Sequence, residues 1–336
     1  MKILIENSTW NNVGDGWYQY SLYYLFKQIY PQHDIYLGEG PIKRAFRIKK
    51  EKLLNNALDL INYQEADLHV FSGPMIKSIF SDYQTAIKKI KARGANYVFI
   101  SVSGTALSKS EITEIGEFLE KYPPLFFSSR DEETYNNFSP YVKNSYNGMC
   151  SAFLVGKTIK THPFKLEKPF FISSFYMELE PFFSVKKSEV FSIENLEIHH
   201  KKKMYGLPFK YSRHLNFSRT HQKEVDNHLI VRTIQNLNTR FNHVNFAVPN
   251  SFISFNPLTY LDVTMSSEFV ISDRVHACAI GLAMGKPARF LFHTPRAGIF
   301  DRLKFNYKNE LGLMYPNPEI IDEEYGKLID QIKKYI

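Results

Sequence analysis

Strand-like and helix-like segments alternate along this chain, and the alternation limits its fold more than any other sequence feature. In the first half, short apolar runs typical of β-strands lie at residues 2–6, 34–37, 66–71, 96–102 and 125–129. Segments with the apolar spacing of helices lie at residues 17–30, 83–92 and 111–120. Such alternation is typical of a parallel sheet with helices on both faces. We therefore expect a doubly wound α/β domain.

The second half repeats this pattern. Strands are predicted at residues 170–175, 228–232, 242–248, 268–271 and 288–292, and helices at residues 258–263 and 319–336. Residues 185–215 are polar, basic and rich in histidine, which indicates an insertion or an active-site loop. Because residues 165–169 have the composition of a linker, we expect domains at residues 1–160 and 165–318, followed by a C-terminal helix at 319–336.

The chain has 336 residues and a net charge of +8 at pH 7. The surplus favours anionic partners, which are phosphorylated small molecules, anionic lipid surfaces or nucleic acid. Part of the charge lies in two basic runs, residues 42–50 and 199–203. Each run is either a solvated face or an interfacial patch for a lipid-linked acceptor, which would give a peripheral contact with the inner membrane surface.

Cysteine usage and hydropathy indicate a cytoplasmic protein. Cys150 and Cys278 are the two cysteines, too few for a disulfide framework or a cysteine-based zinc site. The first residues have no signal-peptide pattern, and no stretch has the roughly 18 apolar residues of a membrane-spanning helix. No known nucleic-acid-binding motif occurs, so we expect no nucleic-acid partner.

The stretch SDRVHACAIGLAMGKP, residues 272–287, places two cationic side chains at the start of a small, apolar helix. With Ser272 or Asp273 as the helix cap, Arg274 and His276 fall in or beside the first turn. Cations there oppose the helix dipole, so the pair predicts an arriving anion, for which arginine offers a rigid fork. The alternative is structural: Arg274 pairs with a nearby carboxylate and His276 is a core histidine.

Two weaker motifs follow predicted strands of the first half. Asn12 and Gly14 belong to the turn NVGDG, in which glycine allows close backbone approach to a ligand. The alternative is a tight turn in which Asp15 caps the next helix. Arg130, in SSRD after the strand at 125–129, either binds an anion or pairs with the acidic residues that follow it. Ligands of open α/β sheets bind at these strand ends.

Several kinds of site are absent from the sequence. There is no Asp-x-Asp, no His-Glu-x-x-His, no nucleophile elbow, no P-loop and no kinase motif set. The eleven histidines do not group with carboxylates at ligand spacing, so we expect neither a metal nor a cofactor.

The three motifs together resemble the polysaccharide pyruvyl transferase family. Asn12-x-Gly14-Asp15 and Arg130-Asp131 match its early motifs, and its late Arg-aliphatic-His…Gly-x-Pro motif is matched at Arg274, Val275, His276, Gly285 and Pro287. The resemblance implies an α/β fold of two Rossmann-like domains facing a cleft, which is GT-B-like, with acceptor and donor sides in the first and second domains. It also implies transfer of pyruvate from phosphoenolpyruvate to a hexose of a bacterial surface polysaccharide or its lipid-linked precursor, as a cyclic ketal.

The residue chemistry suits that reaction. Phosphoenolpyruvate has a carboxylate and a phosphate, which Arg274 and Arg130 would hold together with Ser272 and helix N–H groups. His276 is the candidate acid–base group, and Asp15 is a candidate base toward a sugar hydroxyl. Arg296 either supports one of the two anionic groups or is a surface arginine.

Two alternatives stay open at this stage. One is a metal-independent GT-B glycosyltransferase that holds the diphosphate of a nucleotide sugar at the same helix start. The other is a non-catalytic glycan-binding subunit of an assembly complex.

Overall fold

The computed structural model describes residues 1–8, 12–46, 48, 54, 57–186, 189–200, 222–236, 246 and 248–336. These residues form two compact units. The first unit contains Met1–Ile159, Thr294–Phe305 and Pro318–Ile336, and the second contains Lys160–His293 and Asn306–Asn317. The units therefore differ from the predicted domains, because the segment at 294–305 and the C-terminal helix belong to the first unit.

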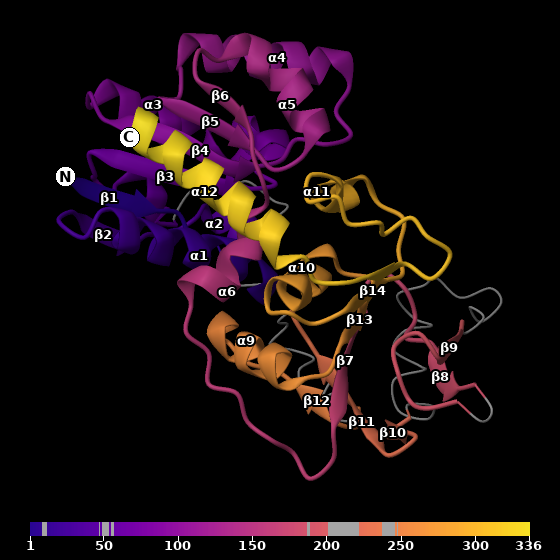
Figure 1. Cartoon of the computed structure of the whole chain (residues 1–336). Helices are drawn as coiled ribbons and strands as arrows, with labels where there is room; N and C mark the ends of the chain where they lie inside the picture. The colour runs from indigo at the N-terminus through magenta and orange to yellow at the C-terminus, as the bar shows by residue number, and fades with distance from the viewer. Residues whose placement is uncertain are drawn as a thin grey trace. The chain divides into compact units, whose positions relative to one another are not determined.

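The first unit is built on a parallel sheet with the strand order β2-β1-β3-β4-β5-β6 in the described residues. Its strands are β1 Lys2–Ile5, β2 Asp34–Leu37, β3 Leu68–Gly73, β4 Asn96–Val102, β5 Phe126–Ser129 and β6 Ser145–Asn147. Its helices are α1 Val13–Ile29, α2 Ile42–Ala45, α3 Gln84–Ala92, α4 Lys109–Lys121, α5 Glu132–Phe138, α6 Val155–Thr158, α11 Gly298–Asp301 and α12 Pro318–Tyr335 (Figure 1). The order is that of a doubly wound sheet, as the alternation predicts.

Helices cover both faces of this sheet because its strands are apolar on both sides. On one face, Phe71, Phe99 and Phe127 pack with α3, α4 and Phe138 of α5 in one buried cluster. On the other face, the ring of Phe126 stacks on Tyr335 of α12 at 5.2 Å between centroids. Figure 1 shows α12 running across the strands on that side. Burial on both faces is typical of parallel sheets.

Phe153 explains why the segment at 294–305 belongs to the first unit. Its ring lies 6.3 Å from Phe300 and 5.8 Å from Phe305, and all three side chains are buried. Residues 294–305 thus return to the first unit after the chain has formed most of the second. The order of strands and helices along the sequence does not show this return, so the sequence predicted a continuous second domain.

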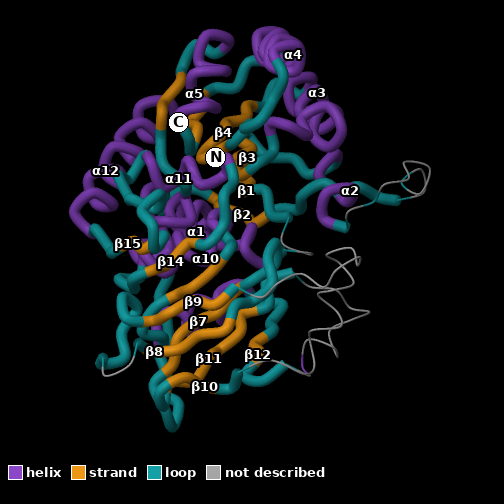
Figure 2. Tube along the Cα trace, turned by 90° about the vertical axis from the view of Figure 1, so that its right-hand side faces the viewer, coloured by secondary structure: helices purple, strands orange, loops and turns teal. Residues whose placement is uncertain are grey.

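The second unit contains a mixed sheet with the described order β10-β11-β7-β13-β14-β15, and β12 pairs with β11 (Figure 2). The strands are β7 Phe170–Ser174, β10 Glu224–Val225, β11 His228–Thr233, β12 Ser251–Phe252, β13 Val270–Ser272, β14 Ala288–Phe290 and β15 Leu313–Met314. The two edge pairs β10–β11 and β14–β15 are antiparallel, and the other pairs are parallel.

Two helices and one hairpin complete the described part of the second unit. The helices are α9 Pro257–Ser266 and α10 Val275–Ala283, and the hairpin is formed by β8 Phe182–Val185 and β9 Leu196–His199. Strand β9 and the last residue of β8 lie within residues 185–215, where the sequence predicted an insertion or a loop, but residues 201–215 lie outside the described residues. Most of the strand predicted at 242–248 also lies outside them.

His69 gives the first testable consequence of this packing. It lies on β3, is 1% exposed, and neither ring nitrogen has a hydrogen-bond partner among the described residues. Burial lowers the pKa of His69 to about 4, and the positive charges of Arg93 and Lys2 add to this effect. The unfolded chain therefore binds a proton at this site more readily than the folded chain does.

We expect the pH dependence of unfolding to show this difference. The contribution of His69 is fully present above pH 6.5, the ordinary pKa of histidine, and is lost as the pH falls toward 4. It corresponds to about 3 kcal/mol in the free energy of unfolding. Denaturation at several pH values should show a flatter acid decline in His69→Leu than in wild type. His162→Leu, at an exposed position, is the control, and an unchanged slope in His69→Leu would contradict the assignment.

Candidate active site

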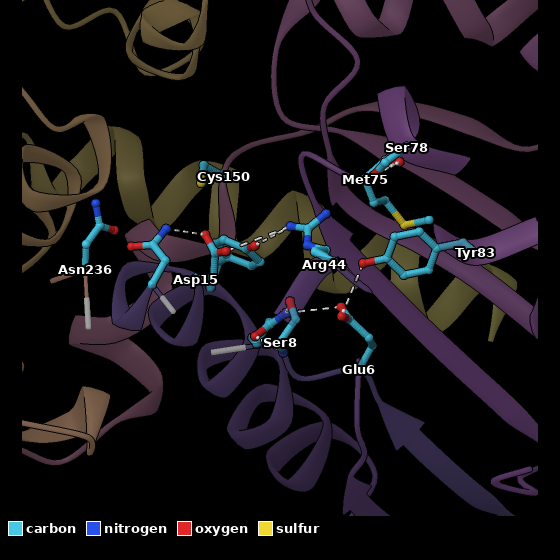
Figure 3. Close-up of polar contacts among 12 residues, drawn as sticks. Glu6, Ser8, Asp15, Arg44, Met75, Ser78, Tyr83, Cys150 and Asn236 are labelled. Carbon is cyan, nitrogen blue, oxygen red and sulfur yellow. Dashed lines mark hydrogen bonds and ion pairs between the residues drawn. The ribbon is translucent and has the colours of Figure 1, made fainter. Parts of the chain in front are cut away.

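A buried polar cluster lies where β1 of the first unit ends. We call Glu6, Asp15, Tyr18, Arg44 and Tyr83 the Arg44 cluster (Figure 3). Glu6 directly follows β1, Asp15 and Tyr18 lie in α1, Arg44 lies in α2, and Tyr83 precedes α3. Their meeting at one end of the sheet follows from the parallel strand order, because the carboxyl ends of parallel strands share one edge.

Arg44 is the cation of this cluster. Its Nη2 atom lies 3.4 Å from the hydroxyl of Tyr18 and 3.9 Å from Oδ2 of Asp15. The guanidinium also lies over the ring of Tyr83, 5.9 Å from its centroid. The Arg44 side chain is 14% exposed, so this member of the basic run at 42–50 is not part of a solvated face.

Glu6 accepts hydrogen bonds from two side chains. The amide of Gln19 donates to Oε2 of Glu6 at 3.0 Å, and the hydroxyl of Tyr83 donates to Oε1 at 3.3 Å. Burial raises the pKa of Glu6, while the nearby charge of Arg44 opposes the rise. Because Glu6 is 1% exposed, its role is to hold the neighbouring side chains of the cluster and not to contact a ligand.

The predicted residues Asn12, Gly14 and Asp15 lie at the start of α1. Helix α1 begins at Val13, so Gly14 and Asp15 are in its first turn rather than in the expected loop. Asn12 is the N-cap position, and its amide donates to Oδ1 of Asp15 at 3.0 Å. Asp15 does not cap the helix: it lies inside the first turn, where a negative charge suits the dipole. Its carboxylate is thus directed by Asn12 on one side and by Arg44 on the other.

Arg130 and Asp131 follow β5 at the same edge of the first sheet. Arg130 is 2% exposed, and its guanidinium lies 6.0 Å from the ring centroid of Tyr18 and, at Nη1, 4.0 Å from the sulfur of Cys150. Asp131 caps α5 by accepting from the backbone N–H of Thr134 at 2.8 Å. Tyr18 therefore has two arginines beside it, Arg44 of α2 at its hydroxyl and Arg130 from the loop after β5 at its ring.

Arg296 is exposed and lies in the first unit, the unit of Arg130. Its segment packs beside the end of β5, because a Cβ atom added to Gly298 would lie 3.5 Å from Cβ of Asp131. The prediction that Arg296 belongs to a second domain at residues 165–318 is therefore wrong, because Arg296 belongs to the first unit.

In the second unit, the start of α10 differs from the sequence prediction in one respect. The N-cap residue is Arg274, with extended backbone, and no side chain caps the helix. Asp273 does not cap α10, because its carboxylate accepts from the backbone N–H groups of Tyr176, Met177 and Glu178 after β7. The first turn of α10 contains no acidic residue. The buried carboxylate of Asp273, next to Arg274 in the chain, interacts with the charge of the Arg274 guanidinium.

The Arg274 guanidinium lies among side chains of the second unit. It lies over the ring of Tyr176, 5.2 Å from the centroid, and Nη2 is 3.4 Å from Oδ1 of Asn236. The hydroxyl of Ser272 accepts from the backbone N–H of Arg274 at 2.9 Å and donates to the carbonyl of Ser174 at 2.5 Å. His276 lies in the first turn of α10 and is half-buried. We call Tyr176, Asn236, Asp273 and Arg274 the Arg274 cluster.

The structure thus brings the predicted residues together in two groups, one in each unit. Asn12, Gly14, Asp15, Arg130 and Arg296 are in the first unit, and Ser272, Arg274 and His276 are in the second. Sequence reasoning missed Glu6, Arg44, Tyr18, Tyr83 and Tyr176. The position of Glu6 as the charged last residue of the strand predicted at 2–6 was a usable signal, whereas the basic run around Arg44 indicated exposure. Among the described residues, no group of three or more His, Cys, Asp or Glu side chains is placed to hold a metal ion.

Solved structures with a similar fold define the architecture of the chain. A putative UDP-N-acetylglucosamine 2-epimerase from Listeria monocytogenes is 12% identical, with a TM-score of 0.51, and the match covers 100% of this chain and 89% of that one. A UDP co-structure of S. aureus MnaA is 10% identical, with a TM-score of 0.53, and covers 99% and 89% of the two chains. At these identities the likeness shows the fold, which is an α/β fold of the GT-B type.

The family follows from the sequence. The family model for polysaccharide pyruvyl transferase matches residues 12–291, so the chain belongs to that family of enzymes. The match includes the Arg44 cluster except Glu6, and all of the Arg274 cluster. No curated protein matches the chain in a sequence comparison. In the part of the chain that the structure describes, no helix has both the length and the apolar composition to cross a bilayer.

Proposed function

We propose that this enzyme transfers the pyruvyl group of phosphoenolpyruvate to a hexose of a bacterial surface polysaccharide or its lipid-linked precursor. The product is a cyclic ketal that bridges two hydroxyls. The observation that supports the donor most strongly is the start of α10. Arg274 is the N-cap residue of α10, and His276 lies in the first turn of this helix, which contains no acidic residue. A helix start that attracts anions and also has a guanidinium suits a small, highly charged donor.

Phosphoenolpyruvate fits this arrangement because its carboxylate and phosphate are both forked oxygen acceptors. We assign one of these groups to Arg274 and the first-turn N–H groups of α10, with Ser272 fixing the backbone of Arg274. We assign Arg130 and Arg296 to the other anionic group. Arg130 is buried beside Tyr18, so its charge would act on the anion without direct contact, whereas the exposed Arg296 is accessible for direct contact.

The chemistry requires one proton donor and two hydroxyl attacks. In the proposed reaction His276 gives a proton to the methylene carbon, and a sugar hydroxyl adds to the adjacent carbon. Phosphate then leaves, a second hydroxyl adds, and the two hydroxyl protons end on the methyl group and the phosphate. An imidazole suits the first step because it exchanges protons near neutral pH, an effect of about 10²–10⁴-fold. We assign Asp15, directed by Asn12 and Arg44, to orient or deprotonate an acceptor hydroxyl.

The proposed location is the cytoplasm, with a peripheral contact at the inner membrane surface when the acceptor is lipid-linked. Both cysteines, Cys150 and Cys278, are buried and unpaired by disulfide, which suits a reducing compartment. Apart from the nearly buried Arg44, the basic run at 42–50 supplies positive charge that favours an anionic lipid surface.

A second candidate is transfer from a nucleotide sugar. The similar S. aureus structure contains UDP, and the same helix start would suit a diphosphate. The two candidates differ in the donor that the enzyme binds and in the mass that it adds to an acceptor.

One experiment separates them. Purified protein is heated with phosphoenolpyruvate, nucleotide sugars or nucleoside monophosphates, and the donor that stabilises it is then incubated with a panel of hexosides. At a concentration 100 times the dissociation constant, a bound donor adds about 2.7 kcal/mol to the free energy of unfolding. We expect stabilisation by phosphoenolpyruvate and a pyruvyl mass increase in a hexoside. Stabilisation by nucleotide sugar alone, with a hexosyl mass increase, would contradict the proposal.

A further inference from the structure

We propose that Tyr176 is a positioning residue, which fixes the direction of the Arg274 guanidinium and thereby sets the affinity for the donor anion. This inference rests on the proposed role of Arg274 in donor binding. It assigns a role in donor binding to a residue outside the Arg-x-His motif, because Tyr176 lies in the turn after β7, almost a hundred positions earlier in the chain.

The turn that contains Tyr176 is fixed by one buried carboxylate. Asp273 is 2% exposed, and its Oδ2 atom accepts from the N–H groups of Tyr176 at 2.9 Å, Met177 at 2.5 Å and Glu178 at 2.7 Å. Its Oδ1 atom also accepts from Tyr176 at 2.9 Å. Hydrogen bonds to a charged acceptor are stronger than neutral ones, so these contacts hold the turn in one conformation.

The fixed turn presents the Tyr176 ring to Arg274. The ring lies against the guanidinium at 5.2 Å from its centroid, which is within the range of a cation–π interaction. The amide oxygen of Asn236 lies at 3.4 Å from Nη2. A flat ring on the guanidinium and an acceptor at its edge together restrict the torsions of a long side chain.

The restriction matters for binding because an arginine side chain loses conformational freedom when it grips an anion. An arginine that is already directed loses less of it, and this raises affinity without any new contact to the ligand. Asp273 and Arg274 are adjacent in the chain after β13. The same segment therefore supplies Asp273, which holds the turn containing Tyr176, and Arg274, which Tyr176 positions. Ring contact rather than the hydroxyl is the part of Tyr176 that the inference needs.

The test compares four variants by calorimetric titration with phosphoenolpyruvate and, separately, with inorganic phosphate. Tyr176→Leu removes the ring and Tyr176→Phe keeps it. Asp273→Asn keeps the shape but replaces one acceptor oxygen with a donor. Asp262→Asn is the matched control, because its carboxylate accepts a single backbone bond, from His162 at 2.7 Å, in another part of the same unit. Thermal unfolding of each variant checks folding.

We expect Tyr176→Leu to raise the dissociation constant for phosphoenolpyruvate about tenfold, and Tyr176→Phe to restore binding to within about twofold of wild type. Asp273→Asn should weaken binding like Tyr176→Leu, and Asp262→Asn should not. In steady-state assays the loss in Tyr176→Leu should appear mainly in KM for phosphoenolpyruvate rather than in kcat.

The outcomes separate this inference from the proposed function. If wild type binds phosphoenolpyruvate and Tyr176→Leu binds it equally well, the positioning role of Tyr176 is wrong, and phosphoenolpyruvate remains the proposed donor. If wild type binds phosphate but not phosphoenolpyruvate, and Tyr176→Leu weakens phosphate binding, the positioning role stands and the donor is wrong. Equal loss of affinity in Tyr176→Leu and Tyr176→Phe would also overturn the role, because it would assign the effect to the hydroxyl.

Discussion

Arg274→Ala is expected to lower the rate of pyruvyl transfer by about 10²–10³-fold, the usual effect of removing one preorganised donor to a reacting anion. The guanidinium is half-buried and lies beside Tyr176 and Asn236, so the alanine variant lacks the fork that the proposed donor site requires. Arg274→Lys should recover only part of the rate, because an ammonium group lacks the planar pair of donors. Initial rates with phosphoenolpyruvate and an active hexoside measure the effect.

The matched control is Arg93→Ala. Arg93 is exposed and precedes β4, at the amino end of a strand of the first sheet, so it should leave the rate near that of wild type. Circular dichroism and thermal unfolding should show that both variants are folded. Transfer by Arg274→Ala within a few-fold of wild type would remove Arg274 from the donor site.

Arg232→Leu is expected to cause the largest loss of stability among the single changes considered, about 3–5 kcal/mol in the free energy of unfolding. Arg232 lies on β11 opposite Ser173 of β7, and its side chain is 5% exposed. Its Nε donates to Oε2 of Glu180 at 2.8 Å, and its other nitrogens donate to the carbonyls of Gln222 at 2.7 Å and Pro249 at 2.9 Å. Removing the arginine leaves a nearly buried carboxylate without this charge.

A double variant distinguishes the lost charge balance from lost packing. Arg232→Leu combined with Glu180→Leu should be more stable than the sum of the two single losses predicts, because no unbalanced charge remains. Denaturation by urea measures all three variants. The exposed pair Lys168–Glu224, at 2.6 Å, is the comparison, and breaking it should cost less than about 1 kcal/mol. Strictly additive losses at Arg232 and Glu180 would contradict the coupling.

The sequence predicted the fold class because alternating periodicity is local information. Each strand predicted in the first half is present, and the helices there differ mainly at their starts, as at Val13 of α1. Strand β6, with the sequence SYN, has no apolar run, so no pattern could reveal it. The return of residues 294–305 to the first unit depends on Phe153, Phe300 and Phe305 meeting in space, which periodicity does not encode.

The candidate site was predictable to the extent that it consists of residues next to strand ends. Arg130 directly follows β5, Arg274 is the second residue after β13, and Asp15 lies in the first turn of the helix that follows β1. The burial of Arg44 could not be predicted from the sequence, because a run of basic residues is typical of a solvent-exposed segment. Arg44 is buried by tertiary contacts that include those with Tyr18 and Asp15. Asp273 was assigned to the nearest helix start, whereas it binds backbone groups nearly a hundred residues earlier in the chain.

The most direct test of the donor site is a crystal structure of the enzyme with phosphoenolpyruvate. We expect the phosphate or the carboxylate of phosphoenolpyruvate to lie within hydrogen-bond distance of the Arg274 guanidinium and the first N–H groups of α10, with His276 beside the methylene carbon. A donor bound elsewhere, with Arg274 engaged only by protein side chains, would contradict it.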